Sequence, residues 1–209
     1  MNAPPRRLVI CIGAVLAGLI LGGGGLGQAQ PAKKGRPAPT LADYDVSHLK
    51  LGGDFTLTNQ DGKPTPLKDY RGRVVVLFFG YTYCPDICPV TMVKMDRVRK
   101  ALERQAAKFQ PILVSIDPQR DTPARLKAYL ANFDRGTVAL TGKPAEVKRA
   151  TDLYRVRYER EESQSPTEYL MAHTAYLYMV DGTGKLRYVF PPDVDDGLLA
   201  AAARLLLRH

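Results

Sequence analysis

The sequence contains no tryptophan, only three cysteines and only three histidines among its 209 residues. So few cysteines exclude a small scaffold held together by disulfides, which needs several bridges in place of a core. Although the net charge is +9, there is no long Lys/Arg block interleaved with aromatic residues, so binding to nucleic acid is not expected. A mildly basic surface suits an acidic protein partner or an anionic membrane surface.

The first 29 residues have the pattern of a membrane anchor or a signal peptide. Arg6 and Arg7 precede an uncharged run from Leu8 to Leu26, which is nearly long enough to span a bilayer and contains Cys11. The segment Gly27-Gln28-Ala29 has the small-x-small pattern of a signal-peptidase site. Both interpretations leave the arginines in the cytoplasm and export the rest of the chain. Residues 30–50, rich in Pro, Ala and charge, are expected to form a flexible tether.

Residues 51–209 are expected to form one α/β domain. Continuous apolar runs at residues 73–80 and 111–116 are typical of strands buried on both faces. Residues 55–67, with the turn Asp61-Gly62, predict a hairpin. Further strands are predicted at 138–140, 156–158, 174–180 and 186–190, and helices from Pro89 onward and at 124–133, 144–153 and 195–208. This order predicts a thioredoxin-like fold with an N-terminal β-hairpin extension.

Cys84 and Cys88 lie in the segment GYTYCPDICP of residues 80–89, between a predicted buried strand and a helix. Open α/β sheets bind ligands at this end of their strands, and helix N-termini lower thiol pKa values. On one helical face the two Cβ atoms would lie about 5–6 Å apart, wider than the roughly 3.8 Å of a relaxed disulfide. The spacing therefore favours a shared metal ion, while a structural disulfide and a catalytic dithiol remain alternatives.

His173 is the best candidate for a third ligand. It lies at the start of the strand predicted at 174–180, and in thioredoxin-like folds the loop before this strand lies against the cysteine loop. Thiolates select copper(I), zinc or iron–sulfur clusters. A cluster normally takes four thiolates and structural zinc four ligands, whereas copper(I) accepts two or three soft ligands. His48 and His209 have no comparable placement and are expected to be solvated.

Several neighbouring residues have structural interpretations. Asp86 is expected to cap the helix that follows it. Asp117 and Asp121 are expected to be turn and cap residues of the next loop, where Thr122 is the predicted N-cap of a helix. Met92, four residues after Cys88, is expected to pack in the core.

These segments together resemble the SCO/SenC family of copper chaperones for cytochrome c oxidase. The resemblance extends from about Asp54 to Phe190. Its motifs are residues 80–89, residues 117–123 (DPQRDTP), Leu140-Thr141-Gly142 and His173-Thr174. One departure is Ala172, which stands where several relatives carry an acidic residue beside the histidine.

The resemblance implies that Cys84, Cys88 and His173 bind one copper ion, as copper(I) and also as copper(II). It implies delivery of that copper to the CuA centre of cytochrome c oxidase subunit II. The expected location is the bacterial inner membrane, with the domain facing the periplasm and another periplasmic copper carrier or a thiol reductant as further partner. The alternative function is a thiol–disulfide oxidoreductase that keeps the CuA-site cysteines reduced, with Cys84 attacking and Cys88 resolving.

Overall fold

The structure, a computed structural model, describes residues 38–133, 136–162 and 168–208. The anchor or signal peptide predicted for residues 1–29 lies outside these ranges. Within them, no helix combines the length and the apolar character needed to cross a membrane. The elements follow one another as η1 (Leu41–Tyr44), β1 (Thr56–Asn59), β2 (Pro64–Pro66), η2 (Leu67–Tyr70), β3 (Val74–Gly80), α1 (Ile87–Ala101), η3 (Glu103–Lys108), β4 (Phe109–Ser115), α2 (Pro123–Leu130), β5 (Val138–Thr141), α3 (Pro144–Leu153), β6 (Tyr158–Arg160), β7 (Met171–His173), β8 (Leu177–Val180), β9 (Leu186–Phe190) and α4 (Asp196–Leu206).

One seven-stranded sheet forms the centre of the domain, with the strand order β2-β1-β5-β4-β3-β8-β9. β3, β4 and β5 are parallel neighbours, whereas β8, β9, β1 and β2 run antiparallel to the strands beside them. β6 and β7 pair with each other in a separate hairpin. This combination of a parallel βαβ unit with an antiparallel ββα unit is the thioredoxin-like arrangement predicted from the sequence.

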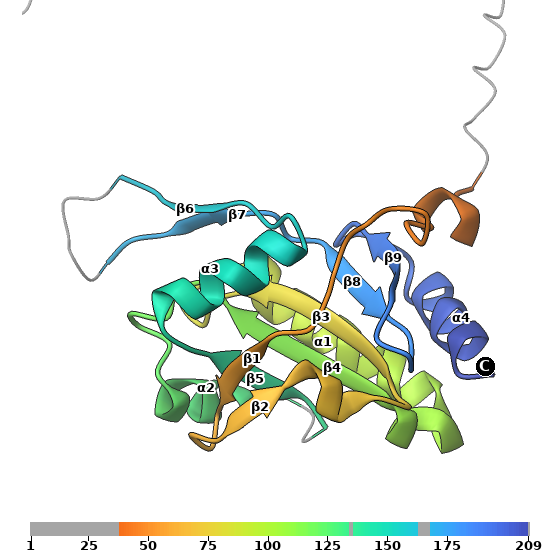
Figure 1. The fold of residues 1–209 in the computed structure, drawn as a ribbon, viewed down its shortest axis with the longest axis horizontal. Helices are drawn as coiled ribbons and strands as arrows, with labels where there is room; N and C mark the ends of the chain where they lie inside the picture. The colour runs from red at the N-terminus through yellow and green to blue at the C-terminus, as the bar shows by residue number, and fades with distance from the viewer. Residues whose placement is uncertain (1–37, 134–135, 163–167, 209) are drawn as a thin grey trace, which may run out of the picture. The chain divides into compact units, whose positions relative to one another are not determined.

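The core lies on both sides of β3 and β4, which are buried along their whole length. Figure 1 shows α3 in front of the sheet and α1 behind it. On one side, Tyr154 packs against Phe79 and Tyr178, with ring centroids 5.6 Å apart in both pairs. Met92 of α1 is fully buried, as expected. The carboxyl end of β3, from which the cysteine loop emerges, is therefore anchored by packing on both faces.

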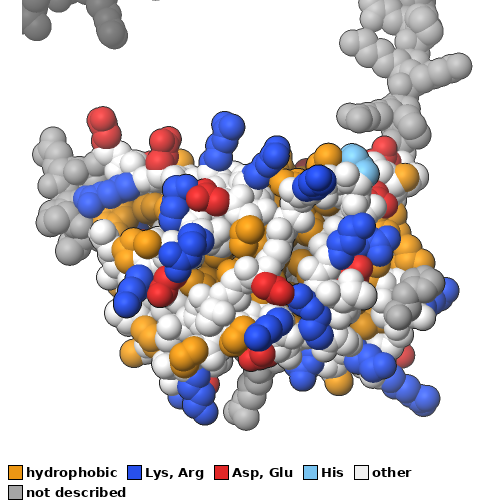
Figure 2. Space-filling model, in the orientation of Figure 1, with side chains coloured by type: hydrophobic (Ala, Val, Ile, Leu, Met, Phe, Trp, Pro, Cys, Tyr) orange, Lys and Arg blue, Asp and Glu red, His pale blue; other side chains and the backbone are white. Residues whose placement is uncertain are grey.

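The charged side chains are distributed over the surface. Figure 2 shows Lys and Arg interspersed with Asp and Glu over the face in view. One of these charges has a structural role. Lys94 of α1 donates to the carbonyl oxygen of Val194 and to the carboxylate of Asp196, and these two bonds tie α1 to the start of α4 near the C-terminus.

Several boundaries differ by a few residues from those expected, and two of them bear on the site. α1 begins at Ile87, two residues before Pro89; this is sterically acceptable because the first turn of a helix needs no donor from proline. The strand expected at 174–180 begins only at Leu177, as β8, whereas His173 ends the separate strand β7, which pairs with β6. Thr122 caps α2 as predicted, since its hydroxyl accepts a hydrogen bond from the Arg125 amide.

Residues 41–46 lie against the domain, which differs from the expectation that all of residues 30–50 form a flexible tether. The Tyr44 ring packs against Phe190 of β9 at a centroid distance of 4.9 Å. The Val46 amide donates to the Arg187 carbonyl at 2.9 Å. These contacts extend the folded unit toward the N-terminus by about ten residues beyond the expected start at residue 51.

Candidate metal centre

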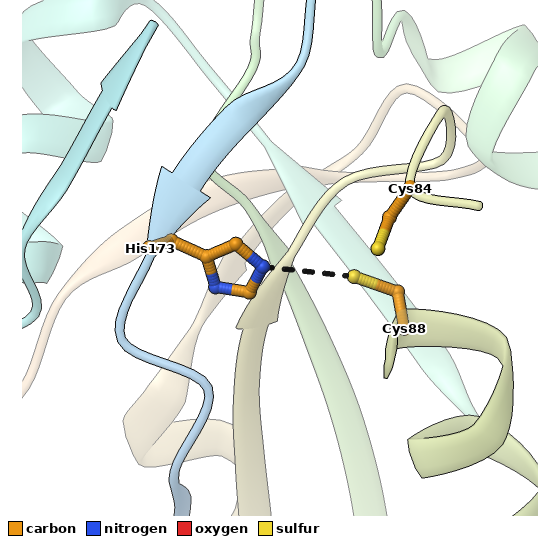
Figure 3. Close-up of side chains that lie close together, drawn as sticks. All are labelled: Cys84, Cys88 and His173. Carbon is orange, nitrogen blue, oxygen red and sulfur yellow. Dashed lines mark hydrogen bonds between the residues drawn. The ribbon is translucent and has the colours of Figure 1, made fainter. Parts of the chain in front are cut away.

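The cysteine loop connects β3 to α1. Cys84 lies in the loop and is partly exposed, whereas Cys88 lies in the first turn of α1 and is fully buried. Both are free thiols. Because Cys84 precedes the helix, the two cysteines do not share a helical face, and the loop itself returns Cys84 towards Cys88 (Figure 3).

Gly80 makes room for the buried sulfur at the end of β3. A Cβ atom at this position would lie 2.8 Å from Cys88 Sγ and 2.7 Å from the Phe78 ring. Both distances are shorter than van der Waals contact, so any larger residue would displace Cys88. Glycine therefore allows the thiol to approach the strand backbone closely.

His173 reaches the cysteines from the β6–β7 hairpin. Its Nε2 atom lies 3.9 Å from Cys88 Sγ (Figure 3). Its Nδ1 atom lies 3.2 Å from the Thr174 carbonyl oxygen, so a proton on Nδ1 donates to that carbonyl and leaves the Nε2 lone pair for a metal. The ring is held edge-on by Phe78 and Tyr81, with centroids 6.2 and 5.9 Å away.

The ligand atoms of Cys84, Cys88 and His173 all lie within 4.8 Å of one another. Among the described residues, no further His, Cys, Asp or Glu joins this group. The prediction that these three residues are brought together is therefore supported by their positions. Two thiolates and one imidazole form a soft, three-ligand set that suits copper(I) better than a four-coordinate structural zinc.

The two thiols have opposite electrostatic environments. The hydrogen bond from Cys88 lowers the pKa of Cys84 to about 4, with further contributions from the backbone amides of Asp86 and Cys88. The same sulfur–sulfur hydrogen bond and burial raise the pKa of Cys88. Without metal, the pair therefore holds one negative charge at neutral pH, carried by the partly exposed Cys84, with the proton on Cys88.

We expect Cys84 of the metal-free, reduced protein to react with iodoacetamide at nearly the same rate from pH 6 to pH 8. A cysteine with a pKa near 8.5 would instead react about tenfold faster for each pH unit over this range. Mass spectrometry after timed quenching gives the alkylation rate of each cysteine. A tenfold rise per pH unit at Cys84 would contradict the lowered pKa.

Asp121 connects the cysteine loop to the neighbouring strand. Its fully buried carboxylate accepts hydrogen bonds from the Thr82 hydroxyl at 2.7 Å, the Thr82 amide at 3.1 Å and the Ser115 hydroxyl at 2.6 Å. Burial raises the pKa of Asp121. The expectation that Asp121 is a turn residue is met by its backbone, because its amide donates to the Asp117 carbonyl oxygen at 2.9 Å. Its side chain, in addition, bonds to residues 39 and 6 positions away along the chain.

Of two other aspartates, Asp86 does not have its expected capping role, and Asp117 makes contacts beyond its predicted turn. Asp86 precedes α1, but its side chain makes no capping hydrogen bond. Asp117 is buried, and it pairs with Arg120 at 2.5 Å and accepts a hydrogen bond from the Tyr169 hydroxyl at 2.8 Å. Asp117 thus contacts the residue range that leads to His173, which the sequence did not indicate.

The fold and the site together define a thioredoxin-like domain with a Cys-Cys-His group placed to bind a metal ion near the carboxyl end of its central strand. The family model described as SCO1/SenC matches residues 45–208, and the chain belongs to this family. The resemblance noted in the sequence is thereby confirmed.

Individual relatives agree with this assignment. The "SCO2-like protein" of Rickettsia felis is 35% identical over 151 residues, covering 72% of this chain and 74% of the relative. ScoI of Bradyrhizobium japonicum, solved with copper bound, is 36% identical with a TM-score of 0.69, covering 75% of this chain and 99% of that one. Yeast Sco1, also solved with copper bound, is 30% identical with a TM-score of 0.70, covering 77% and 90%.

Proposed function

We propose that this protein binds one copper ion through Cys84, Cys88 and His173 and delivers it to the CuA centre of cytochrome c oxidase subunit II during assembly. The observation that carries the proposal is the convergence of these three ligand atoms within 4.8 Å. The copper-bound structures of the Bradyrhizobium and yeast relatives support copper as the metal. A further Sco protein that shares the fold is described as belonging to a family of cytochrome c oxidase assembly proteins.

The chemistry of the site suits a carrier. Two thiolates and one imidazole bind copper(I) tightly because soft ligands favour this soft ion. Three ligands nevertheless leave one side of the ion open to an incoming ligand. Cys84 is partly exposed while Cys88 is buried. An acceptor thiolate can therefore replace Cys84 first, while Cys88 and His173 still hold the ion.

The protein's surroundings follow from the same proposal. The uncharged N-terminal run after Arg6 and Arg7 would attach the chain to the bacterial inner membrane and place the domain in the periplasm. Delivery from this domain would then require the CuA centre of subunit II to be exposed in the same compartment. Another periplasmic copper carrier would load the site, or a thiol reductant would keep Cys84 and Cys88 reduced.

The lowered pKa of Cys84 supports a second candidate function, that of a thiol–disulfide oxidoreductase acting on the CuA-site cysteines. The Cys84 thiolate would attack an oxidised CuA cysteine pair and form a mixed disulfide. Cys88 would then resolve it, leaving both acceptor thiols reduced and a Cys84–Cys88 disulfide on this protein. An external reductant would restore the two thiols.

One experiment separates the two functions. The copper-free soluble domain of subunit II is mixed either in its dithiol form with the copper-loaded protein, or in its disulfide form with the metal-free, reduced protein. Delivery predicts that metal analysis finds copper on the subunit II domain after the two proteins of the first mixture are separated, and that Cys88→Ser protein transfers none. Reduction without transfer, seen as new acceptor thiols in the second mixture alone, would overturn delivery and favour the oxidoreductase.

A further inference from the structure

Arg120 lies between the two parts of the chain that supply the metal ligands. It belongs to the loop from β4 to α2, and its guanidinium stacks on two tyrosine rings. The guanidinium carbon is 4.6 Å from the ring centroid of Tyr83, the residue directly before Cys84. It is 3.5 Å from the ring centroid of Tyr169, four residues before His173. One side chain therefore contacts both the cysteine loop and the segment that leads to the histidine.

Hydrogen bonds fix the orientation of this guanidinium. Arg120 Nε donates to the Asp117 carboxylate at 2.5 Å, and Arg120 Nη1 donates to the Tyr169 carbonyl oxygen at 2.9 Å. The Tyr169 hydroxyl donates to the other oxygen of Asp117 at 2.8 Å. The Arg120 and Asp117 side chains are only 11% and 3% exposed. Charge-assisted hydrogen bonds with so little exposure are stronger and more directional than surface ion pairs.

Tyr81 makes a second link between the same two parts. Its buried hydroxyl accepts a hydrogen bond from the Met171 amide at 3.1 Å, two residues before His173. Its ring packs edge-on against the imidazole. Tyr81 also lies 5.8 Å from the Arg120 guanidinium carbon. Arg120, Tyr169 and Tyr81 thus fasten the histidine segment to the cysteine side of the site.

The position of His173 depends on such links because β7 is not part of the main sheet. β6 and β7 pair through three residue pairs in a sheet of their own. A two-stranded hairpin of this size is at best marginally stable by itself. Cys88, in contrast, is held by α1 against the core. The distance between the His173 imidazole and the thiols therefore depends on the contacts that join the β6–β7 hairpin to the cysteine loop.

We propose that Arg120 is a positioning residue of the metal centre, which fastens the His173-bearing hairpin to the cysteine loop and so sets the approach of the imidazole to the metal. This inference rests on the proposed function in one respect, that His173 is a ligand. Arg120 would affect copper affinity only by positioning His173, because the guanidinium itself binds no metal.

The test compares full-length wild type, Arg120→Met, His173→Ala and the double variant. Copper(I) affinity is measured by competition with a chromophoric chelator, and imidazole coordination by the nitrogen couplings in the electron paramagnetic resonance of the copper(II) form. Arg120→Met is expected to weaken copper(I) binding about tenfold, the lower end of the range for residues that orient a metal ligand, and to diminish the imidazole couplings. In the His173→Ala background, Arg120→Met should cause no further loss.

The matched control is Arg187→Met. Arg187 is also a partly buried arginine with a carboxylate partner, Asp181 at 3.3 Å, but it lies on β9 rather than at the site. The copper(I) affinity and the imidazole couplings of the Arg187→Met protein should equal those of the wild type. This control separates loss of the link at the metal centre from the general cost of removing a paired arginine.

A milder variant keeps the proposal testable if Arg120→Met does not fold. Tyr81→Phe removes only the hydroxyl that accepts the Met171 amide, and it should reduce the imidazole couplings in the same direction. Unchanged couplings and affinity in the folded variants, or an equal loss from Arg120→Met with and without His173, would overturn the role of Arg120. If His173→Ala alone left copper binding intact, the ligand set of the proposed function would fail instead.

Discussion

Replacing Cys88 with serine should lower copper(I) affinity by more than about 100-fold, a greater loss than the 10–100-fold typical of residues that only orient a ligand. Serine keeps the size of the side chain but replaces a soft thiolate with a hydroxyl that copper(I) binds poorly. Cys84→Ser should have a similar effect. His173→Ala should have a smaller effect, because two thiolates remain and copper(I) accepts two soft ligands.

The measurement is an anaerobic copper titration of the reduced full-length protein in the presence of a competing chelator. The wild type should bind one copper per chain. Cys11→Ser is the matched control, since Cys11 lies in the uncharged N-terminal run and is not expected to bind metal. Retention of tight, stoichiometric binding in Cys88→Ser would show that the copper is held elsewhere.

Asp121→Ala should destabilise the domain by about 3 kcal/mol. The substitution leaves the Thr82 amide and the hydroxyls of Thr82 and Ser115 without their buried acceptor, and each unsatisfied buried group costs about 1–3 kcal/mol. The substitution also removes the desolvation cost of the buried Asp121 carboxylate, which raises its pKa, and this gain offsets part of the lost stability. For a domain of this size, such a loss lowers Tm by about 6–12 °C.

Asp121→Asn is the matched control for this prediction. Asparagine keeps the shape and one carbonyl acceptor, so it should restore most of the stability lost in Asp121→Ala. Chemical denaturation of metal-free protein, followed by circular dichroism, gives the free energy of unfolding for both variants. Equal stability of Asp121→Ala and wild type would contradict the view that this carboxylate holds the cysteine loop to β4.

The central strands and the cysteine pair could be predicted because their signals are local. Residues 73–80 and 111–116 are continuous apolar runs, and the structure places β3 and β4 there, buried at every position. Thr122 followed by Pro123 is a local helix-start pattern, and the cap formed as expected. Cys84 and Cys88 were recognisable from a strand-to-helix loop alone, whereas His173 required knowledge of where its loop lies in this fold.

The remaining features depend on contacts between distant parts of the chain. β6 and β7 have three residues each, too few for a periodic pattern, and their pairing places His173 on a hairpin. Asp121 looks like a turn residue by sequence, but its main partner Thr82 is 39 residues away. Arg120 donates a hydrogen bond to the carbonyl oxygen of Tyr169, which is 49 residues away along the chain. Nothing in the local sequence indicates these pairs, because only the folded sheet brings them together.

The central claim is that two sulfurs and one imidazole nitrogen hold a single copper ion. X-ray absorption spectroscopy of the protein loaded with one equivalent of copper(I) tests it most directly, with His173→Ala as the comparison. We predict a three-coordinate ion with two sulfur ligands and one nitrogen ligand from an imidazole, and loss of the imidazole scattering in the variant. A spectrum with sulfur ligands alone, unchanged in His173→Ala, would contradict the three-ligand centre.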